Sequence, residues 1–324
     1  MSISAVILAA GKSTRMKSAL PKVLHPLCGK PMLTYAIDAC AGAGVDRIVI
    51  VVGHGKQQVI DAFADRSDCT FVEQAPQNGT AHAVLCCRDA LAGVTGQVLV
   101  LAGDMPLVRS DTLRTLLAEN AKAGDGLTLA TTMLDEPAGY GRIVRDDQGC
   151  LEAIVEHKDC TPAQLAIKEV NPSYYCFDGA RMFDVLGRIQ NHNAKGEYYI
   201  TDAVGIMLAD GHGAGAVAAV PSDQATGINS RADLAAVNRL MQDRIQAEIM
   251  DSGVTLTDPA NTWIDSGVAI APDTIIGPFT FIGADAVIGF GCRIGPFAYL
   301  PARARLNDGQ TVTPSESLAG AATP

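Results

Sequence analysis

The chain opens with Ala5-Val-Ile-Leu-Ala-Ala-Gly-Lys-Ser-Thr-Arg-Met16, followed after four residues by Pro21-Lys22. Residues 6–8 form a short apolar run, the pattern of a strand that is buried on both faces of a parallel sheet. Small residues follow where this strand ends, and they let a base or a phosphate approach the backbone. Lys12, Arg15 and Lys22 bring three positive charges to the same place. Because ligands of open α/β sheets bind outside the carboxyl ends of the strands, this stretch predicts a site for an anionic ligand.

Two familiar nucleotide-binding motifs do not fit this opening. Gly11-Lys12-Ser13 is similar to the end of a Walker A loop, but Val6 stands where that loop requires a glycine. The dinucleotide fingerprint GxGxxG also fails, because Ser13 holds its second glycine position. The remaining pattern, L-A-A-G-x-[ST]-R-M followed by P-K, resembles the signature of sugar-1-phosphate nucleotidyltransferases. The alternative is an ordinary strand-to-helix turn with chance lysines.

Composition narrows the class of protein. A length of 324 residues suggests about two domains, and a hydrophobic content of 48% suffices for a packed core. No apolar run approaches the ~20 residues of a membrane span, and the start lacks the basic residues and long apolar run of a secretion signal. The nine cysteines include no C-x-x-C pair, so we expect a cytoplasmic protein. The net charge of −10 argues against nucleic acid as a partner, and we expect no membrane partner either.

Apolar strands alternate with helical segments over the first part of the chain. We expect strands at residues 47–52, 70–74, 97–102 and 127–134, with helices near residues 31–40, 57–64, 80–92 and 111–123. This alternation predicts a Rossmann-like α/β domain with a mostly parallel sheet covered on both faces. A glycine-rich hairpin over residues 139–156 and a strand from residue 169 would build a second wall of the ligand pocket.

Polar residues stand at the ends of the third and fourth strands. Gln74 precedes Gln77-Asn-Gly-Thr-Ala-His82, where an amide beside a Gly-Thr turn offers donors and acceptors to a base edge. The alternative is a plain turn with Thr80 as a helix N-cap. His82 is interpreted as a packed or capping histidine, because no partner for it is evident in the sequence.

Asp104 follows Gly103 at the end of an apolar strand, a common position for a Mg²⁺ ligand, although an N-cap aspartate is the alternative. Asn229 precedes a helix predicted at about residues 232–250. It is either the N-cap of that helix or a neutral oxygen ligand of the same metal. In the second wall, Gly141 would let a sugar ring approach, and Glu156 and Asn171 would bond its hydroxyls.

The C-terminal part carries a repeat. Aliphatic residues recur every six positions, the hexapeptide repeat of a short left-handed parallel β-helix. With three hexapeptides in each coil, the repeat makes fewer than three coils. The last histidine is His212 and the last lysine is Lys195, so an acetyl-transfer site has no candidate base and the β-helix is interpreted as an oligomerisation module. The repeated positions are Ile264, Ile270, Ile276, Ile282, Ile288, Ile294, Leu300 and Leu306.

These patterns predict four segments. A nucleotidyltransferase domain is expected over residues 1–230, a linking helix over 231–251 and the β-helix over 252–306. The polar residues 307–324 are expected to form a disordered tail.

With these residues in place, the whole chain resembles the bacterial family of bifunctional N-acetylglucosamine-1-phosphate uridyltransferases and glucosamine-1-phosphate acetyltransferases. The match covers about residues 1–250, the linking helix and the first β-helix coils. Ala102 stands where some members carry a larger residue. The acetyltransferase half is truncated, so we expect that activity to be missing. The shared motifs, in order, are L-A-A-G-K-S-T-R-M, P-K, Q-x-x-x-x-G-T-A-H-A, G-D-x-P-L, G-Y-G-R-I, E-H-K-D, E-V-N, G-E-Y-Y-I-T-D and G-I-N-S-R.

The resemblance implies an enzyme that transfers UMP from UTP to N-acetylglucosamine 1-phosphate, with Mg²⁺ as cofactor. The products, UDP-N-acetylglucosamine and pyrophosphate, would serve cell-envelope precursor synthesis. Arg15, Lys22 and Asp104 would be the catalytic residues, and Asp104 and Asn229 would hold the metal. Uridine would be bound by Leu8, Ala9, Ala10, Gly11, Gln74, Gly79 and Thr80, the phosphates by Arg15 and Lys22, and the sugar by Gly141, Glu156, Asn171 and Thr201. Ala102, Gly103, Asp104 and Asn229 complete the expected substrate-binding residues.

Other readings stay open at this stage. One is a related nucleotidyltransferase that uses glucose 1-phosphate or a different nucleoside triphosphate, although E-H-K-D and E-V-N favour the N-acetyl sugar. Another is a non-catalytic regulatory homologue that keeps the fold. A homotrimer is usual for β-helices of this type, but fewer than three coils is a short length on which to build one.

Overall fold

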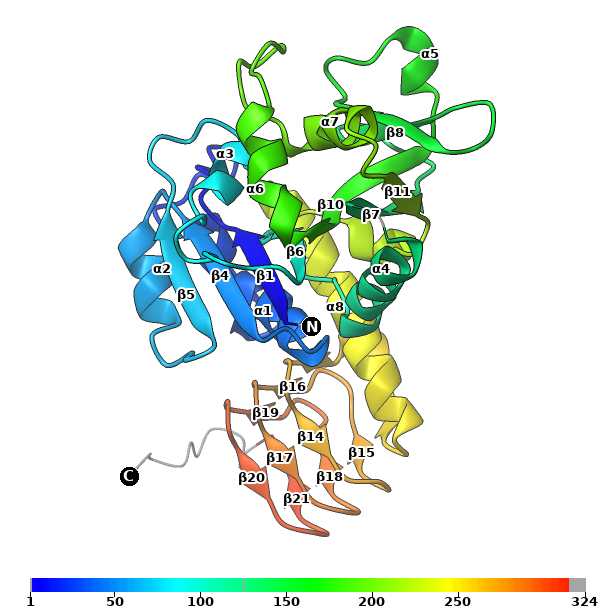
Figure 1. The fold of residues 1–324 in the computed structure, drawn as a ribbon. Coiled ribbons are helices and arrows are strands. Elements are labelled where there is room, and N and C mark those ends of the chain that lie inside the picture. Colours follow the sequence, from blue (N-terminus) through cyan, green and yellow to red (C-terminus); the bar gives the residue numbers. More distant parts are fainter. Residues whose placement is uncertain (1, 125, 315–324) are drawn as a thin grey trace. The chain divides into compact units, whose positions relative to one another are not determined.

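The computed structural model describes residues 2–124 and 126–314. These residues form two compact units (Figure 1). The first unit contains the chain up to His25 and Met32–Asn229. The second contains Pro26–Pro31 and the chain from Ser230 onward. The chain therefore passes between the units at three points.

The first unit is built on one sheet. In the described residues this sheet has nine strands, and its main path runs β11-β7-β10-β6-β1-β4-β5, with β8 and β9 attached beside β10. Strands β5, β4, β1 and β6 are parallel, β10 is antiparallel to both β6 and β7, and β11 is parallel to β7. The mostly parallel sheet predicted from the sequence is confirmed. The strands are β1 (Ile3–Leu8), β4 (Arg47–Val52), β5 (Cys69–Glu73), β6 (Gln97–Ala102), β7 (Leu127–Met133), β8 (Gly141–Arg145), β9 (Leu151–Val155), β10 (Glu169–Asp178) and β11 (Ala214–Val217).

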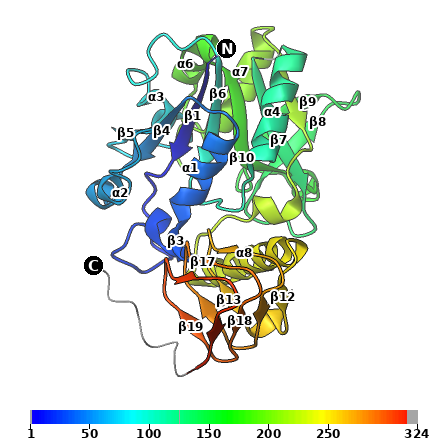
Figure 2. The ribbon, with the colours of Figure 1, turned by 90° about the horizontal axis from the view of Figure 1, so that it is seen from below.

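Strand β1 lies inside the sheet between β4 and β6, and its side chains alternate between two cores. Ala5 and Ile7 pack into one core, while Val6 packs into the other, and all three are fully buried. Helices α1 (Met32–Gly42) and α4 (Ser110–Ala123) contribute to the first core, and Figure 2 shows α1 beside β1. Burial on both faces explains why β1 reads as a continuous apolar run rather than as an alternating one.

Several shorter helices complete the first unit: α3, α6, η2 and α7 pack into the core that contains Val6, whereas η1, α2 and η3 contribute to the other core. Helix α3 is shorter than the segment predicted at residues 80–92, because the chain turns after Leu85. In the part of the chain that the structure describes, no helix is long and apolar enough to cross a membrane. The remaining helices of this unit are η1 (Lys22–Leu24), α2 (Lys56–Ala62), α3 (Thr80–Leu85), α5 (Pro162–Leu165), α6 (Gly179–Arg188), η2 (Ile200–Asp202), α7 (Ala203–Ala209) and η3 (Ser222–Ala225).

The second unit joins a long helix to a β-helix. Helix α8 (Arg231–Asp251) begins at a capping box made by Ser230 and Asp233, and Gln242 and Gln246 on its buried face bond the β-helix backbone. Each short strand pairs in parallel with the strand three further along, so three strands make one coil, as expected of a left-handed parallel β-helix. These strands are β12 (Thr255–Leu256), β13 (Trp263–Ile264), β14 (Ala269–Ile270), β15 (Ile275–Ile276), β16 (Phe281–Ile282), β17 (Val287–Ile288), β18 (Arg293–Ile294), β19 (Tyr299–Leu300), β20 (Arg305–Leu306) and β21 (Thr311–Val312). A separate hairpin, β2 (Pro26–Leu27) with β3 (Lys30–Pro31), belongs to the same unit.

The predicted disordered tail is wrong for its first residues. Strand β21 lies inside the range 307–324, and Val312 is buried with 9% of its surface exposed. Its carbonyl accepts a hydrogen bond of 2.9 Å from Gly295 N. Val312 continues the six-residue repeat beyond Leu306, so the polar residues between them form the turn of another coil. Residues 315–324 of the predicted tail lie outside the described residues.

The repeat predicts which side chains stabilise the β-helix. Ile282 is fully buried, whereas Val287 is 40% exposed. We expect Ile282→Ala to cost about 2–5 kcal/mol of unfolding free energy through lost burial and a cavity. Val287→Ala, the control, should stay within about 0.5 kcal/mol. Trp263 is the chain's single tryptophan and lies in β13, so its fluorescence during urea unfolding follows the second unit. Equal losses of unfolding free energy in the two variants would contradict an inward-facing Ile282 side chain.

Candidate active site

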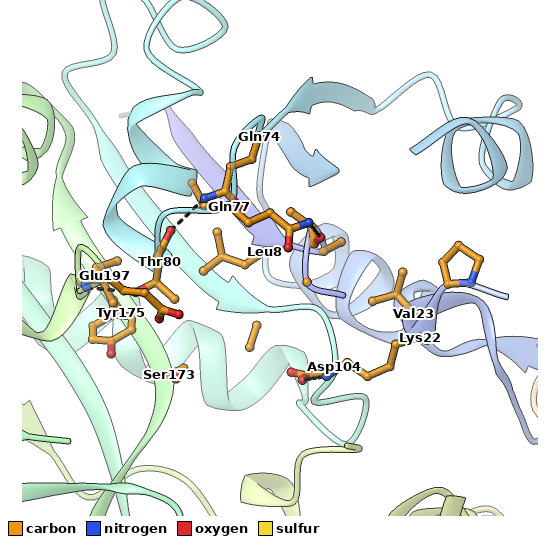
Figure 3. Close-up of a pocket in the computed structure, with 18 residues that line it drawn as sticks. Leu8, Lys22, Val23, Gln74, Gln77, Thr80, Asp104, Ser173, Tyr175 and Glu197 are labelled. Carbon is orange, nitrogen blue, oxygen red and sulfur yellow. Dashed lines mark hydrogen bonds and ion pairs between the residues drawn. The ribbon is translucent and has the colours of Figure 1, made fainter. Parts of the chain in front are cut away.

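A cavity of about 320 Å³ opens at the carboxyl ends of β1, β5 and β6. In Figure 3, Gln74 and Gln77 lie on one side of it, Tyr175 and Glu197 on another, and Lys22 and Asp104 point toward each other. Many of the residues predicted to bind substrate line this cavity. The lining residues are Leu8, Ala9, Ala10, Gly11, Pro21, Lys22, Val23, Gln74, Gln77, Gly79, Thr80, Ala83, Ala102, Asp104, Ser173, Tyr175, Glu197 and Ile200.

The backbone after β1 forms one wall of the cavity. Gly103 N donates to Leu8 O, and Ala9 N donates to Val51 O, both at 2.9 Å, so the neighbouring strands hold this turn in place. The Gln77 side chain donates to Ala10 O from the other side. Gln77 received no role in the sequence analysis. Its position inside the quoted Gln77–His82 stretch was the one available signal.

A second wall is built by the loop that precedes α3. Gln74 is 5% exposed, and its Nε2 donates to Gly79 O at 2.9 Å and lies 3.2 Å from His82 Nδ1. Thr80 is not the N-cap, because Gly79 takes that position, and Thr80 Oγ1 instead accepts from Ile200 N at 3.0 Å.

This loop is joined to a distant segment of the chain. Tyr198 N donates to Asn78 O at 2.8 Å, and Ala81 N donates to Tyr198 O at 2.9 Å. Gly79 lies between these bonds with a φ of 109°, a backbone conformation that favours glycine. A Cβ at Gly79 would lie 2.5 Å from the Tyr198 carbonyl oxygen, so the close approach also excludes a side chain.

Three charged or polar groups converge beside this cavity. Lys22 Nζ contacts the Asp104 carboxylate and lies 3.3 Å from Asn229 Oδ1. The Lys22 and Asp104 side chains are 13% and 24% exposed, so both are largely withdrawn from water. Ile228 N donates to Asp104 O at 2.9 Å, which holds the segment carrying Asn229 against the end of β6.

The oxygens of Asp104 and Asn229 suit a hard divalent cation. They face one position from two sides, and the Lys22 ammonium now supplies the positive charge between them. In the described residues, no group of three or more His, Cys, Asp or Glu side chains could hold a metal by itself. A site with one carboxylate and one amide oxygen fits a magnesium ion that completes its shell with water and substrate phosphates.

Arg15 is the predicted catalytic residue that the structure does not bring to this cluster. It is exposed, and among the described residues it is not part of the cavity lining. Asn229 and Gly103 adjoin lining residues without lining the cavity themselves. The role of Arg15 stays a prediction.

The predicted sugar residues gather behind the lining. Asn171 pairs with Gly141 across β10 and β8, and its Nδ2 donates to the hydroxyl of Tyr175, which lines the cavity. Thr201 Oγ1 lies 3.4 Å from Glu156 Oε1 and donates to it. These four predicted residues are therefore near the cavity but outside its lining. Tyr175, Ser173 and Glu197 do line it and were missed, although they adjoin the E-V-N and E-Y-Y motifs.

Burial changes the titration of the acidic groups in this wall. It raises the pKa of the Glu156 carboxyl, against the smaller opposing effects of Lys195 and the Thr201 hydroxyl. It also raises the pKa of Asp202, with Asp159 adding to the effect. Both carboxyls keep their protons to a higher pH than ordinary carboxyls.

Comparison with known proteins agrees with this fold. Residues 5–189 match the family model described as the MobA-like NTP transferase domain. The chain is 42% identical to the "Bifunctional protein GlmU" of Pelobacter propionicus, over 99% of this chain and 71% of that protein. It is 45% identical to the protein of the same name from Pelotomaculum thermopropionicum, over 94% and 74%. It is 46% identical to the protein of the same name from Trichlorobacter lovleyi, over 91% of this chain and 64% of that protein.

The fold, the cavity at the strand ends and the matched domain define a nucleotidyltransferase. The chain belongs to the GlmU family of NTP transferases.

Gly79 offers a test of the joined loop. We expect Gly79→Ala to lower the unfolding free energy by more than about 3 kcal/mol, because strain at this φ, about 1–3 kcal/mol, adds to the clash with Tyr198. Gly93→Ala is the control: its φ is 75°, but a Cβ there meets nothing within 4 Å. It should cost about 1–2 kcal/mol from backbone strain alone. Urea unfolding followed by circular dichroism measures both. Equal costs would show that Tyr198 does not constrain the loop.

The raised pKa of Glu156 predicts a pH-dependent cost to folding. Above the ordinary glutamate pKa of 4.5, the unfolded chain releases this proton while the folded protein retains it, so wild-type stability falls as pH rises through that window. Glu156→Gln removes the cost. The variant should be more stable than wild type at neutral pH, and the difference should disappear below pH 4.5. Unfolding free energies measured between pH 4 and 8 test this.

Glu169 is the matched control, because its pKa is shifted in the opposite direction. Burial tends to raise its pKa, but hydrogen bonds from Arg145 and Thr131 outweigh burial and lower it. Its ionised form therefore stabilises the fold above the ordinary pKa, and this contribution is lost as pH falls through the lowered value. Glu169→Gln should be less stable than wild type at neutral pH. If both glutamine variants changed the unfolding free energy in the same direction at neutral pH, the opposite pKa shifts of Glu156 and Glu169 would be refuted.

Proposed function

We propose that this chain transfers UMP from UTP to N-acetylglucosamine 1-phosphate and releases pyrophosphate. The observation that carries the proposal is the convergence of Lys22, Asp104 and Asn229 beside a cavity whose other walls carry amide and backbone groups. A cation and metal-ligand oxygens suit a triphosphate, and Gln74 with the Gly79 backbone suits a base edge.

The chemistry requires positioning more than proton transfer. The sugar phosphate is already an anion, so one of its oxygens attacks the α-phosphorus of UTP directly. The bond from that phosphorus to the bridging oxygen breaks, and pyrophosphate leaves with the electron pair. Lys22 lies where its charge would bind the phosphates and offset the negative charge of the transition state. The lining of small residues 9–11 leaves room for the triphosphate to approach the backbone.

Asp104 and Asn229 would hold the Mg²⁺ ion, since their oxygens face one position. When bound, this ion neutralises charge on the phosphates and orients them. Lys22 would then leave its present contact with the Asp104 carboxylate and turn toward the phosphates. Arg15, exposed near the same turn, is proposed as a second phosphate contact that forms only with substrate present.

The N-acetyl sugar is proposed to bind against Gly141, Glu156, Asn171 and Thr201. Two contacts support this. Asn171, which pairs with Gly141, bonds the lining residue Tyr175, and Thr201, which bonds Glu156, directly follows the lining residue Ile200. Bound hydroxyls would accept from Asn171 and donate to the Glu156 carboxylate. Glucose 1-phosphate as the substrate is the alternative within the same chemistry.

Three further expectations are part of the proposal. We infer that the chain as given does not transfer acetyl groups, since no histidine follows His212 and no lysine follows Lys195. We also infer a cytoplasmic protein that forms a homotrimer through its β-helix. The exposed, stacked pair Phe279 and Phe297 supports association through that unit. Light scattering on the purified chain measures the oligomer.

Pyrophosphate release with Mg²⁺ and UTP tests the reaction directly. N-acetylglucosamine 1-phosphate should support faster release than glucose 1-phosphate or glucosamine 1-phosphate. Faster release with glucose 1-phosphate would show that glucose 1-phosphate is the substrate and would leave the proposed mechanism unchanged. Nucleotide binding without release for any sugar would favour a regulatory homologue.

Single substitutions test the residues. Asp104→Ala and Lys22→Ala should each lower kcat/KM by at least about 100-fold while the protein stays folded, because each removes charge compensation at the phosphates. Asp147→Ala, in the exposed turn between β8 and β9, is the matched control and should turn over at the wild-type rate. Near-normal turnover of either site variant would remove that residue from the proposed mechanism.

A further inference from the structure

The orientation of the Gln74 amide is set by two acceptors. Its Nε2 lies 2.9 Å from Gly79 O and 3.2 Å from His82 Nδ1. A backbone carbonyl can only accept, so the Gln74 atom facing Gly79 must be the NH₂ group. That group has two hydrogens, and a neutral His82 that accepts at Nδ1 takes the second.

The surroundings of His82 agree with this tautomer. Its Nε2 faces Cys86 Sγ at 4.0 Å, one turn further along α3. Because Nδ1 faces the Gln74 NH₂ group and has to accept, the proton of the neutral ring is on Nε2, where it points toward the sulfur. His82 was predicted to be a packed or capping residue with no evident partner, and its contact with Gln74 shows that it has one.

The remaining atom of the amide is an acceptor. With both hydrogens engaged, Gln74 Oε1 is left for a ligand in the cavity that Gln74 lines. A carbonyl oxygen there pairs with an N–H group on a base edge and not with a bare ring nitrogen. Uracil presents an N–H at its N3 position, whereas cytosine presents a lone pair at the same position.

We propose that His82 is a positioning residue that selects a base with a ring N–H by holding the Gln74 amide in one orientation. The inference rests on the proposed function for the presence of a pyrimidine nucleotide in this cavity. His82 touches no reacting atom in this role. It acts through Gln74, and its effect is on the choice between UTP and CTP rather than on the rate of phosphoryl transfer.

Loss of the hydrogen-bond acceptor on His82 should weaken the selectivity for UTP over CTP. In His82→Leu one amide hydrogen of Gln74 loses its partner, and the orientation that offers Nε2 to the ligand becomes more accessible. The ratio of the Kd values for CTP and UTP should fall by roughly tenfold, the effect of about one hydrogen bond. His82→Asn returns an acceptor near the former Nδ1 position and should restore most of the ratio.

Isothermal titration of the full chain with UTP and with CTP, in Mg²⁺ and without sugar, measures this selectivity separately from turnover. Leu85→Ala, in the same helix, is the control and should keep the wild-type ratio. His82→Ala serves if the leucine variant does not fold. Equal weakening of UTP and CTP binding, with the ratio unchanged, would show that His82 is only structural and would overturn the proposal.

Failure of the proposed reaction is distinguishable from failure of this inference. A wild-type protein that binds UTP selectively but releases no pyrophosphate would refute the reaction and leave the role of His82 standing. A wild-type protein that binds UTP and CTP equally would refute the role of His82, whatever the rate of pyrophosphate release.

Discussion

The contact of the Lys22 ammonium with the Asp104 carboxylate and the Asn229 amide is the constraint on which the site depends. Lys22 begins the short helix η1, Asp104 follows the end of β6, and Asn229 lies in the chain before α8. A largely buried cation requires compensation, so these segments have to stay together. The bond from Ile228 N to Asp104 O holds two of them together, and the contacts of Lys22 with Asp104 and Asn229 join the third to them. The cluster resembles a phosphate site in its resting state, with the positive charge already present.

The end of the cavity formed by Gln74 and the loop before α3 depends on backbone hydrogen bonds rather than on charge. The loop before α3 is tied to residues 198–200 through Asn78, Thr80 and Ala81. The side-chain amides of Gln74 and Gln77 then bond backbone carbonyls of Gly79 and Ala10. Polar groups that are fixed in this way keep a defined pattern of donors and acceptors before a ligand arrives, which lowers the ordering cost of binding. The two ends of the cavity are therefore held together by different physical means.

The second unit shows what the six-residue repeat predicts. The repeat extends further along the chain than the predicted β-helix did. The six-residue repeat predicted inward-facing positions, and Ile264, Ile276 and Ile282 are fully buried. Ile270 and Leu306, in the two edge strands of one of the three sheets, are only partly buried. An edge position alone does not decide this, since Ile264 also lies in an edge strand and is fully buried. The tail was predicted from its polar composition, while Val312 kept the repeat. In a β-helix the turns are polar and only one position in six must be aliphatic, so period is the stronger signal.

The features that depend on neighbouring residues along the chain were predictable from the sequence alone. These are a strand β1 buried on both faces, the alternation of strands and helices, the polar residues at strand ends, and the repeat of the β-helix. Each follows from side-chain periodicity and burial within a few residues. Only the tertiary structure decided that Tyr175 and Glu197 line the cavity, that Asn171 and Glu156 lie behind it, that Arg15 stays outside it, and that His82 contacts Gln74. These arrangements depend on how loops from distant segments meet, and no local pattern encodes that meeting. The sequence thus located the strand ends where the cavity opens, and the fold determined which side chains line it, because the packing of the whole unit sets how distant segments approach one another across the sheet.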